Sequence, residues 1–558
     1  MNRSQPVPHL PPVPQQFIQS PRHQPALDAL TLQARADLER LNLPPANWVP
    51  PQPAPDADGA PVLDVLVAGG GMCGQTVAQA LLFEGIRNIR AIDSQPLGDE
   101  GPWGTFARML TLRSPKHLTG PDLGVPSMTF RAWYEAQHGT GVDSRFAPGY
   151  PGWAGLHKVG RLDWRDYLLW VRGVLNLPIA NGTRLLEVSD QSTGTGGPLI
   201  RARVQDASGE HTLWCRKLVL ALGRDGSGAP RWPAFPSLDA AEAQRHPRVF
   251  HSADAIDFEA ISARGYWSNG LNDSKNTGAA SSTGTATGTT TGHSHIAVLG
   301  AGASAFDNAA CALEAGARVS QFCRRPQLPQ VNKSKWTAFA GCLQGFEALD
   351  DARKWQIYAY IFSEQVPPPW ETVRRCDAHD AFALHLGAPW LDVRADDDGV
   401  TVVTPQGEQR FDAVIYGTGF DVNLTERPEM ARYSPHIDTW ARHVSAADAA
   451  ACTEAAGFPY LGPGFELRST SGTHAAALAN IHLFNWGSTL SHGAVAGDIP
   501  GLANGARRLA RALLRDLFVA DADTHWQALL AHDEAELLNT RWHAAPGRGL
   551  GAGPVNPA

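Results

Sequence analysis

A short apolar run, a glycine-rich turn and a helical pattern follow one another early in the chain. The apolar run is 64–68 (DVLVA), the turn is 69–74 (GGGMCG), and apolar residues then recur at helical spacing over 76–84. A short apolar run bounded by turn residues predicts a buried strand, and the recurrence predicts a helix. A further apolar run at 88–92 completes the expected succession of strand, turn, helix and strand.

The turn has the spacing G-x-G-x-x-G, which is typical of sites for the pyrophosphate of a dinucleotide. Gly69 permits the tight turn, Gly71 lets the backbone approach the phosphates, and Gly74 lets the helix pack closely on the strand. Free amides and the helix dipole hold the anion. Asp93 ends the second strand, where a carboxylate accepts hydrogen bonds from ribose hydroxyls and repels a 2′-phosphate. The residues predicted to bind this dinucleotide are Gly69, Gly71, Met72, Cys73, Gly74, Asp93 and Ser94.

The same succession returns in the second half of the chain. The apolar run 296–299 (IAVL) precedes the turn 300–305 (GAGASA), a helical pattern over 306–314 and a second apolar run over 318–323. Alanine replaces the third glycine of the turn, and an alanine still allows helix and strand to pack closely. The sequence therefore predicts a second dinucleotide site of the same build.

Arg324 and Arg325 follow the second strand of this later unit, where the first unit has Asp93. Two guanidinium groups there would bind a 2′-phosphate through charge-assisted, often bidentate hydrogen bonds, so this unit is expected to prefer NADP over NAD. A solvated basic turn is the alternative. The residues predicted to bind the second dinucleotide are Gly300, Gly302, Ala303, Ser304, Ala305, Arg324 and Arg325.

An acid-ended first site and an arginine-ended second site in one chain suit a bound FAD and an exchanging NADPH, with electrons passing between them. We expect an α/β fold with two Rossmann-like dinucleotide-binding domains, one for FAD and one for NADP(H), and a discontinuous FAD domain. The predicted division is a proline-rich arm at 1–60, the first part of the FAD domain at 61–235, a linker at 236–292, the NADP domain at 293–415, the second part of the FAD domain at 416–520 and a tail at 521–558.

Two segments differ from the rest in composition. Residues 1–60 hold 13 of the 42 prolines, which predicts an extended arm with one helix near 26–41 that either packs on the protein or binds a partner. Residues 268–292 contain 11 Ser or Thr and 5 Gly among 25 residues, and they cannot bury enough apolar area to offset the entropy of ordering. This low-complexity insertion is expected to be a flexible surface excursion.

Composition and charge narrow the choice of partners. A net charge of -8 argues against nucleic acid or an anionic membrane surface, and favours a small, apolar ligand. The seven cysteines are scattered without a CxxC pair, which indicates a reducing compartment rather than disulfides. No signal peptide or long apolar span is present, so a cytoplasmic location is expected. Because neither HExxH nor a 2-His-1-carboxylate spacing occurs, no metal is expected.

Several further motifs resemble those of the class B flavin monooxygenases, which comprise flavin-containing, Baeyer–Villiger and N-hydroxylating monooxygenases. Residues 101–104 (GPWG) are similar to the GGxW segment that lies along the flavin, and 112–116 (LRSPK) to a loop near the isoalloxazine. Residues 161–170 (RLDWRDYLLW) resemble a helix of the same group. Residues 217–223 (KLVLALG) and 412–421 (DAVIYGTGFD) look like the two junctions between the FAD and NADP domains.

The resemblance extends over about residues 62 to 515. Residues 483–487, 497–498 and the helix expected at 501–517 resemble the segment whose aspartate and helix N-terminus meet the flavin. A positive helix end there would stabilise a reduced, anionic flavin. The resemblance adds Trp103, Gly223, Gly417, Thr418, Gly419 and Asp498 to the predicted cofactor-binding residues.

What the resemblance implies is an NADPH- and O2-dependent monooxygenase that inserts one oxygen atom into a small organic substrate through a C4a-(hydro)peroxyflavin. A cation beside the peroxide would favour its deprotonated state. Arg113 is the candidate for this catalytic role, and a structural salt bridge is the alternative; His117 and His251 are weaker candidates. The Baeyer–Villiger fingerprint is not intact, because position 247 is Pro rather than Gly.

Two other functions fit parts of the pattern. An NADPH-dependent flavoprotein reductase would need no oxygen transfer, although the absence of a CxxC or CxxxxC pair counts against disulfide chemistry. A non-catalytic nucleotide-binding scaffold is the third possibility, since a fold alone does not prove turnover. Near-complete fingerprints in both units count against the scaffold.

Overall fold

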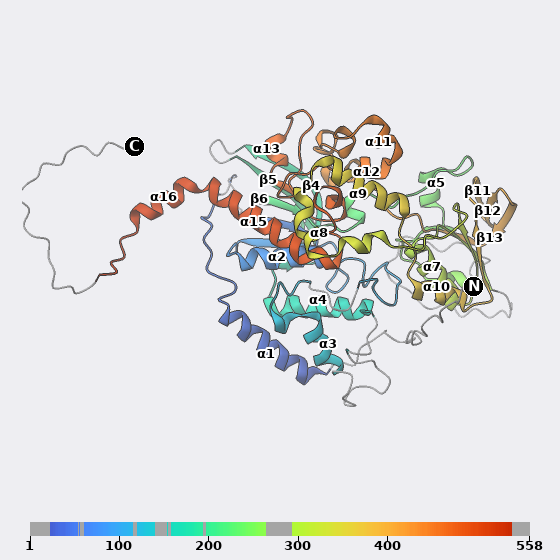
Figure 1. Cartoon of the computed structure of the whole chain (residues 1–558), viewed down its shortest axis with the longest axis horizontal. Helices are drawn as coiled ribbons and strands as arrows, with labels where there is room; N and C mark the ends of the chain where they lie inside the picture. The colour runs from blue at the N-terminus through green and yellow to red at the C-terminus, as the bar shows by residue number, and fades with distance from the viewer. Residues whose placement is uncertain are drawn as a thin grey trace, which may run out of the picture.

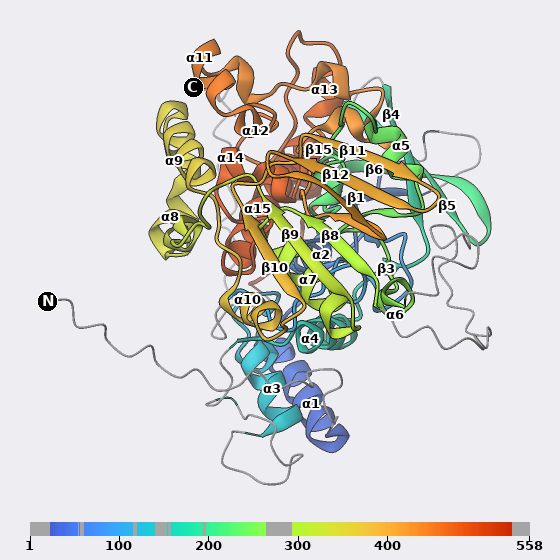
Figure 2. The ribbon, with the colours of Figure 1, turned by 90° about the vertical axis from the view of Figure 1, so that its right-hand side faces the viewer.

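The computed structural model describes residues 23–53, 55, 61–114, 120–139, 153, 158–192, 197–263 and 293–537. Within these residues the protein has two large sheets and one small antiparallel sheet, with helices packed around them (Figures 1 and 2). The insertion predicted at 268–292, residues 1–22 of the proline-rich arm and residues 538–558 of the tail lie outside the described residues.

The first sheet is built around β1 (Val62–Ala68), which the apolar run at 64–68 predicts. Every residue of β1 is buried, and the strand runs parallel to β2 (Ile89–Ile92) on one side and to β6 (Gly209–Leu220) on the other. β15 (Ile481–Leu483), from the C-terminal part of the chain, pairs in parallel with β6. The first domain is therefore discontinuous, as predicted. The remaining strands of this sheet are β3 (Ile179–Ala180), β4 (Arg184–Ser192) and β5 (Pro198–Asp206).

Two helices pack together on the first sheet. α2 (Met72–Phe83) begins inside the glycine turn, earlier than the helix predicted at 76–84. α15 (Leu502–Ala520) lies against it, and Leu81 of α2 shares one buried cluster with Leu509 of α15. Burial of a leucine side chain contributes about 1.5–3 kcal/mol. Since the segment before α15 also contacts the start of α2, this packing holds a C-terminal loop against the first glycine turn.

The second sheet repeats the parallel arrangement around β8 (His295–Leu299). β9 (Arg318–Cys323) and β14 (Ala413–Tyr416) flank β8, and β10 (Phe382–Leu386) and β7 (Val249–His251) form the edges. β7 comes from the segment predicted as a linker. That segment thus contributes an edge strand to the second sheet.

The two faces of the second sheet are covered by different structures. α7 (Ala303–Glu314) and α10 (Trp370–Asp377) pack on one face, and the antiparallel strands of the small sheet cover the other (Figure 2). Side chains of β8 alternate between the two, because Val298 packs beside α7 whereas Ala297 packs towards the small sheet. The small sheet consists of β11 (Asp392–Asp396), β12 (Gly399–Thr404) and β13 (Gly407–Phe411).

Between β9 and β10 the chain leaves the second sheet and packs on the C-terminal part of the first domain. α8 (Ala340–Gly345) and α9 (Asp351–Glu364) form this excursion. Tyr358 of α9 lies in one buried cluster with Phe458 and Leu490. The excursion therefore connects the two dinucleotide-type domains by packing as well as by sequence.

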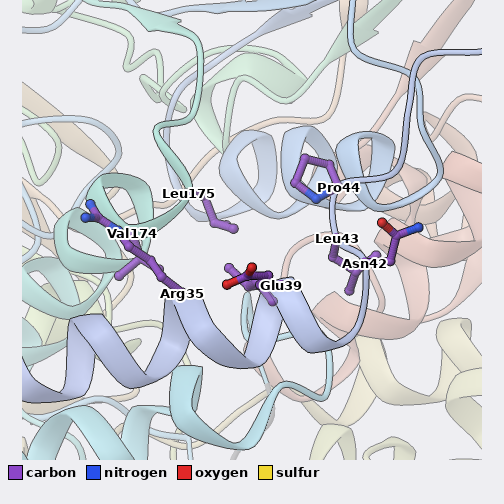
Figure 3. Close-up of a pocket in the computed structure, with 8 residues that line it drawn as sticks. Arg35, Glu39, Asn42, Leu43, Pro44, Val174 and Leu175 are labelled. Atoms are coloured by element: carbon purple, nitrogen blue, oxygen red, sulfur yellow. The ribbon is translucent and has the colours of Figure 1, made fainter.

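A layer of helices lies below the first sheet in Figure 1. α1 (Gln24–Arg40) confirms the helix predicted near 26–41, and it packs against α3 (Phe130–His138) and α4 (Arg161–Leu175). A groove of about 410 Å3 runs between α1 and α4 (Figure 3). The groove is lined by Arg35, Leu38, Glu39, Asn42, Leu43, Pro44, Val174 and Leu175, none of which is a predicted site residue.

Shorter helices complete the described part of the chain. They are α5 (Ala240–Arg245), α6 (Phe258–Ser262), α11 (Ala446–Ala451), α12 (Thr453–Ala456), α13 (Ala475–Leu478), α14 (Thr489–His492) and α16 (Ala522–Ala531). None of the helices in the described ranges combines the length and the apolar content that crossing a bilayer requires.

Candidate active site

The first glycine turn is built as the sequence predicts. Gly69 has φ of +109°, and a Cβ there would lie 2.3 Å from the carbonyl oxygen of Ala221. A Cβ at Gly74 would lie 1.8 Å from the carbonyl oxygen of Gly69, so both positions require glycine. At Gly71 the nearest atom to such a Cβ is Cα of Gly101, at 3.6 Å. The first and third glycines thus serve packing, and the second leaves the backbone open to a ligand.

Asp93 lies directly beside this turn. Its Oδ2 accepts a hydrogen bond from the amide of Gly70 (2.7 Å), and its Oδ1 accepts one from the amide of Gln95 (2.8 Å). Burial raises the pKa of Asp93, and these two amides oppose the rise. A carboxylate has about four acceptor sites, so Asp93 is oriented by the turn and can still accept hydrogen bonds from a ribose. Ser94 follows on the surface.

The second glycine turn uses a different packing solution. Gly300 has φ of +114°, and a Cβ there would lie 2.6 Å from the carbonyl oxygen of Gly417. Ala305, in place of the third glycine, is fully buried, and its Cβ would lie 2.5 Å from a Cβ at Gly417. A Cβ at Gly302 would meet no described atom within 4 Å, which leaves this turn open at its second glycine. Ala303 and Ser304 form the first residues of α7.

Arg324 and Arg325 follow β9 at the same edge of the sheet. The strand is tied to the turn, because the Nε2 of Gln321 donates to the carbonyl of Gly300 (2.9 Å). The side chains of both arginines make no hydrogen bond or ion pair with any residue that the structure describes. The two guanidinium groups are thus free to bind an anion beside the second turn.

Asp498 and Cys73 bring the C-terminal segment to the first glycine turn. The thiol of Cys73 donates to the carbonyl of Ala496 (3.1 Å), and burial together with the charge of Asp498 raises the pKa of Cys73 to about 12. The thiol therefore stays protonated and packs. Burial also raises the pKa of Asp498, whereas Arg224 and Arg113 lower it. The positive charges of two arginines thus act on the aspartate that the sequence assigns to the flavin.

Arg113 makes no ion pair with a described carboxylate, so the salt bridge offered as an alternative is absent from the described part of the chain. Its Nη1 donates to the carbonyl of Pro367, at 2.8 Å. Burial lowers the pKa of Arg113, and Asp307 opposes this effect. Arg113 thus links a loop of the first domain to the segment between α9 and α10. His117, the neighbouring candidate, lies outside the described residues.

His251 ties β7 to the junction at 417–419. Its Nδ1 accepts from the amide of Ala253 (3.1 Å), so Nε2 carries the proton and donates to the carbonyl of Gly419 (3.1 Å). Burial lowers the pKa of His251 to about 4. His251 is therefore neutral and structural. Thr418 donates to the carbonyl of Arg231, which holds the same junction, and Gly223, at the other junction, has φ of +75°.

Trp103 is held by the helix that resembles the class B motif. Arg161, the first residue of α4, donates Nη1 to the carbonyl of Trp103 and Nε to the carbonyl of Met109 (2.9 Å). Further along α4, Tyr167 donates to the carbonyl of Met128 (2.7 Å). α4 therefore fixes the course of the loop that begins at the predicted flavin segment.

Arg224 and Trp486 form a pair that the sequence did not reveal. The guanidinium of Arg224 lies 4.0 Å from the centre of the Trp486 ring. Trp486 packs against the segment that contains Asp498, because a Cβ at Gly497 would be 3.3 Å from Cα of Trp486. The one signal in the sequence was that Arg224 follows Gly223, because the two partners are far apart along the chain.

The sequence also gave no sign of a polar contact between the two domains. Arg108, in the first domain, donates to the carbonyls of Ser252 (3.1 Å) and Asp254 (2.7 Å) at the end of β7. In turn Arg375 of α10 donates to the carbonyl of Arg108 (3.2 Å) and pairs with Glu314 of α7 (2.8 Å). These bonds fasten the second domain to the loop between Trp103 and Arg113.

The first turn and its surroundings fit FAD. Gly71 leaves an open approach for a pyrophosphate, and Asp93 is placed for a ribose. Two buried donors, the Nε1 of Trp103 and the Nδ2 of Asn485, have no hydrogen-bond partner among the described residues. Buried donors without acceptors are costly, so a ligand rich in acceptors suits this site. In the same residues no group of three metal-binding side chains comes together.

Comparison with known proteins agrees with this arrangement. No family model matches the chain. The chain is 39% identical over 503 residues to a FAD-dependent urate hydroxylase from Xanthomonas campestris pv. campestris, covering 90% of this chain and 95% of that protein.

Solved structures agree on the fold. Ornithine hydroxylase from Pseudomonas aeruginosa matches with a TM-score of 0.58 at 16% identity, covering 82% of this chain and 100% of that one. L-lysine 6-monooxygenase from Pseudomonas syringae matches with a TM-score of 0.56 at 18% identity, covering 81% and 99%. From the relation to the hydroxylase and this shared fold, the chain belongs to the class B FAD-dependent monooxygenases, which insert one oxygen atom into a small organic substrate.

Proposed function

We propose that this chain is an NADPH-dependent hydroxylase of urate or a closely related oxopurine. The observation that carries the proposal is the 39% identity to a FAD-dependent urate hydroxylase along 95% of that protein. Composition favours an apolar substrate. Arg113 and Arg224 make no ion pair with a described acid, and their charges favour a polar, anionic substrate instead. In this proposal the substrate is therefore a planar anion rather than an apolar molecule.

The proposed sites follow the two glycine turns. FAD is held in the domain formed by 61–235 and 416–520, and NADPH in the domain at 293–415, with 236–292 between them. The residues proposed for FAD are Gly69, Gly71, Met72, Cys73, Gly74, Asp93, Ser94, Trp103, Gly223 and Asp498. Those proposed for NADPH are Gly300, Gly302, Ala303, Ser304, Ala305, Arg324 and Arg325, and Gly417, Thr418 and Gly419 are proposed as cofactor-binding residues at the junction between the two domains. The unpaired state of the cysteines supports a cytoplasmic location.

Bound FAD would accept a hydride from NADPH and activate oxygen. The protein itself would position the two cofactors and exclude water from the site. The amides at Gly71 and Gly302 would hold the two pyrophosphates, and Asp93 would accept hydrogen bonds from the ribose of FAD. Arg113, anchored on the carbonyl of Pro367, would supply a positive charge to the bound flavin.

The test uses purified full-length protein. We expect a yellow protein whose flavin is bleached faster by NADPH than by NADH, and oxygen uptake that urate stimulates. Incorporation of one atom from labelled oxygen gas into the purine product would support the proposal. NADPH consumption without labelled product would contradict it and support the reductase, while a protein without flavin would support the scaffold.

A further inference from the structure

Arg224, in the segment after β6, carries a positive charge that no ion pair with a described acid neutralises. Arg224 is exposed, and its side chain makes no hydrogen bond or ion pair with a described residue apart from its position over the Trp486 ring. Arg113 is half-buried and is bonded to one neutral carbonyl. Burial lowers the pKa of Arg113, and the positive charge of Arg224 lowers it further.

Asp498 does not balance this charge. Asp498 interacts with both arginines, but neither guanidinium lies within 4.0 Å of its carboxylate. Burial raises the pKa of Asp498, which weakens its negative charge further. Arg113 is half-buried, and a positive charge that has lost part of its hydration is unfavourable unless an anion pairs with it. The arrangement thus calls for a negatively charged ligand.

The geometry of the pair fits a planar ligand. Trp486 holds the guanidinium of Arg224 by a cation–π contact at 4.0 Å, and Phe458 and Phe362 support the indole at 6.1 Å and 6.4 Å between ring centres. A supported indole limits the orientations of the guanidinium. A guanidinium held in this way presents a planar row of donors, which matches a planar oxoanion better than a lysine would.

We propose that Arg224, oriented by Trp486 and assisted by Arg113, is the subsite that recognises the anionic oxopurine substrate. This inference rests on the proposed function. Arg224 contacts the substrate, and Trp486 is a positioning residue that acts through Arg224. Arginine side chains bind anions of several kinds. The phosphates of FAD and of NADPH are therefore two alternative ligands of Arg224 that the experiment must distinguish from the substrate.

The experiment compares wild-type holoenzyme with Arg224→Gln, Arg224→Lys and Trp486→Leu. The readouts are FAD content, KM for NADPH, kcat and KM for urate, and the Kd of urate from the change in the oxidised flavin spectrum. We expect Arg224→Gln to raise KM and Kd for urate about 10- to 100-fold, the effect of losing a charge-assisted hydrogen bond. Arg224→Lys should fall between Arg224→Gln and wild type. FAD content and KM for NADPH should not change.

A double variant separates positioning from a merely structural role. If Trp486 acts through Arg224, then Trp486→Leu combined with Arg224→Gln should bind urate no more weakly than Arg224→Gln alone. Arg468→Gln is the matched control, because Arg468 is also an exposed arginine over an aromatic ring, 5.4 Å from Tyr460. This control should leave every readout at the wild-type value.

Each result decides between distinct conclusions. Wild-type enzyme that neither binds nor oxidises urate would overturn the proposed function and the subsite together. Wild-type enzyme that oxidises urate, with an unchanged KM in Arg224→Gln, would overturn the subsite alone. Loss of FAD, or a raised KM for NADPH, in Arg224→Gln would assign the arginine to a cofactor phosphate and would also overturn it.

Discussion

The two dinucleotide sites differ at one position by the sign of the charge. Asp93 is bonded to the amide of Gly70, so its carboxylate is part of the first turn. Arg324 and Arg325, at the same place after β9, make no such bonds among the described residues. A carboxylate held against a turn suits a resident cofactor with free ribose hydroxyls. Free guanidinium groups suit a cofactor that binds and leaves with a 2′-phosphate.

Arg324→Ala together with Arg325→Ala should lower the ratio of kcat/KM for NADPH to that for NADH about 10- to 100-fold, because each charge-assisted hydrogen bond contributes about 1.5–3 kcal/mol. Steady-state kinetics with both nucleotides measures the ratio. Arg318→Ala, at the opposite end of β9, is the control. An unchanged ratio in the double variant would remove the 2′-phosphate assignment.

At the scale of elements, the second turn has an alanine at the helix position where the first turn has its third glycine. A glycine stands instead in the facing segment after β14. Ala305 fills the space that a third glycine would leave, and Gly417 provides the room that Ala305 needs. A side chain at Gly417 would also approach the carbonyl oxygen of Leu299 at 2.9 Å. The helix, the strand and the junction are thus fitted to one another, while Gly302 stays open.

Two single substitutions should separate packing from binding at this turn. Gly417→Ala overpacks the contact and should lower stability by about 1–3 kcal/mol, seen as a lower thermal midpoint. Gly302→Ala meets no described atom within 4 Å, so it should leave the midpoint unchanged and raise KM for NADPH by blocking the approach of the pyrophosphate. A stable Gly417→Ala variant, or a Gly302→Ala variant with unaltered KM, would contradict this division of roles.

The sequence predicts those elements whose signals are local. Both glycine turns lie within a short stretch that carries its own strand and helix patterns, and the structure has both turns where they were expected. β7 and β15 were not predicted, because each has three residues and too little length to display a period. The pair of Arg224 and Trp486 was not predicted for another reason, because only the fold brings β6 and β15 together.

At the scale of the whole molecule, polar bonds cross the boundary between the two dinucleotide-type domains. Arg108 donates to two carbonyls at the end of β7 and receives Arg375 on its own carbonyl. Thr372 donates to Asp307 (2.9 Å), which ties α10 to α7 on the same side. Hydride transfer depends steeply on the placement of the two reacting groups, so this contact bears on the rate of flavin reduction.

Arg108→Ala should therefore slow flavin reduction by NADPH without weakening the binding of either cofactor. We expect a reduction rate at least about tenfold lower in anaerobic stopped-flow measurements, since small displacements cost large factors in rate. FAD content and the Kd of NADP+ should equal those of the wild type. Arg131→Ala, an exposed arginine of α3, is the control. A normal reduction rate in Arg108→Ala would show that the contact does not set the geometry.

Buried titratable groups couple the stability of the whole chain to pH. Burial lowers the pKa of His482 and of His492 to about 3. The Nδ1 of His482 lies 2.7 Å from the carbonyl of Gly464, and the Nε2 of His492 lies 3.0 Å from that of Gly462. Burial also raises the pKa of Asp64 to about 7, and protonation of this group in the folded state has the opposite effect on stability.

The sign for the histidines follows from proton binding. Below the ordinary pKa of 6.5, both histidines bind protons in the unfolded chain. In the folded chain His482 and His492 stay neutral down to about pH 3. Stability is therefore fully present above pH 6.5 and falls as the pH falls, by about 1.4 kcal/mol per unit for each histidine. His482→Gln with His492→Gln removes these two titrations. The variant should lose less stability than the wild type between pH 7 and pH 5, by about 4 kcal/mol in total.

Denaturant unfolding at several pH values measures this difference. The variant can be less stable at pH 7, because glutamine fills the two sites less well, and the slope against pH is the quantity that decides. His532→Gln, an exposed histidine after α16, should keep the wild-type slope. Asp64 contributes equally to the wild type and the variant, so its effect cancels in the comparison. Parallel curves for wild type and the double variant would show that the two histidines are not the source of acid sensitivity.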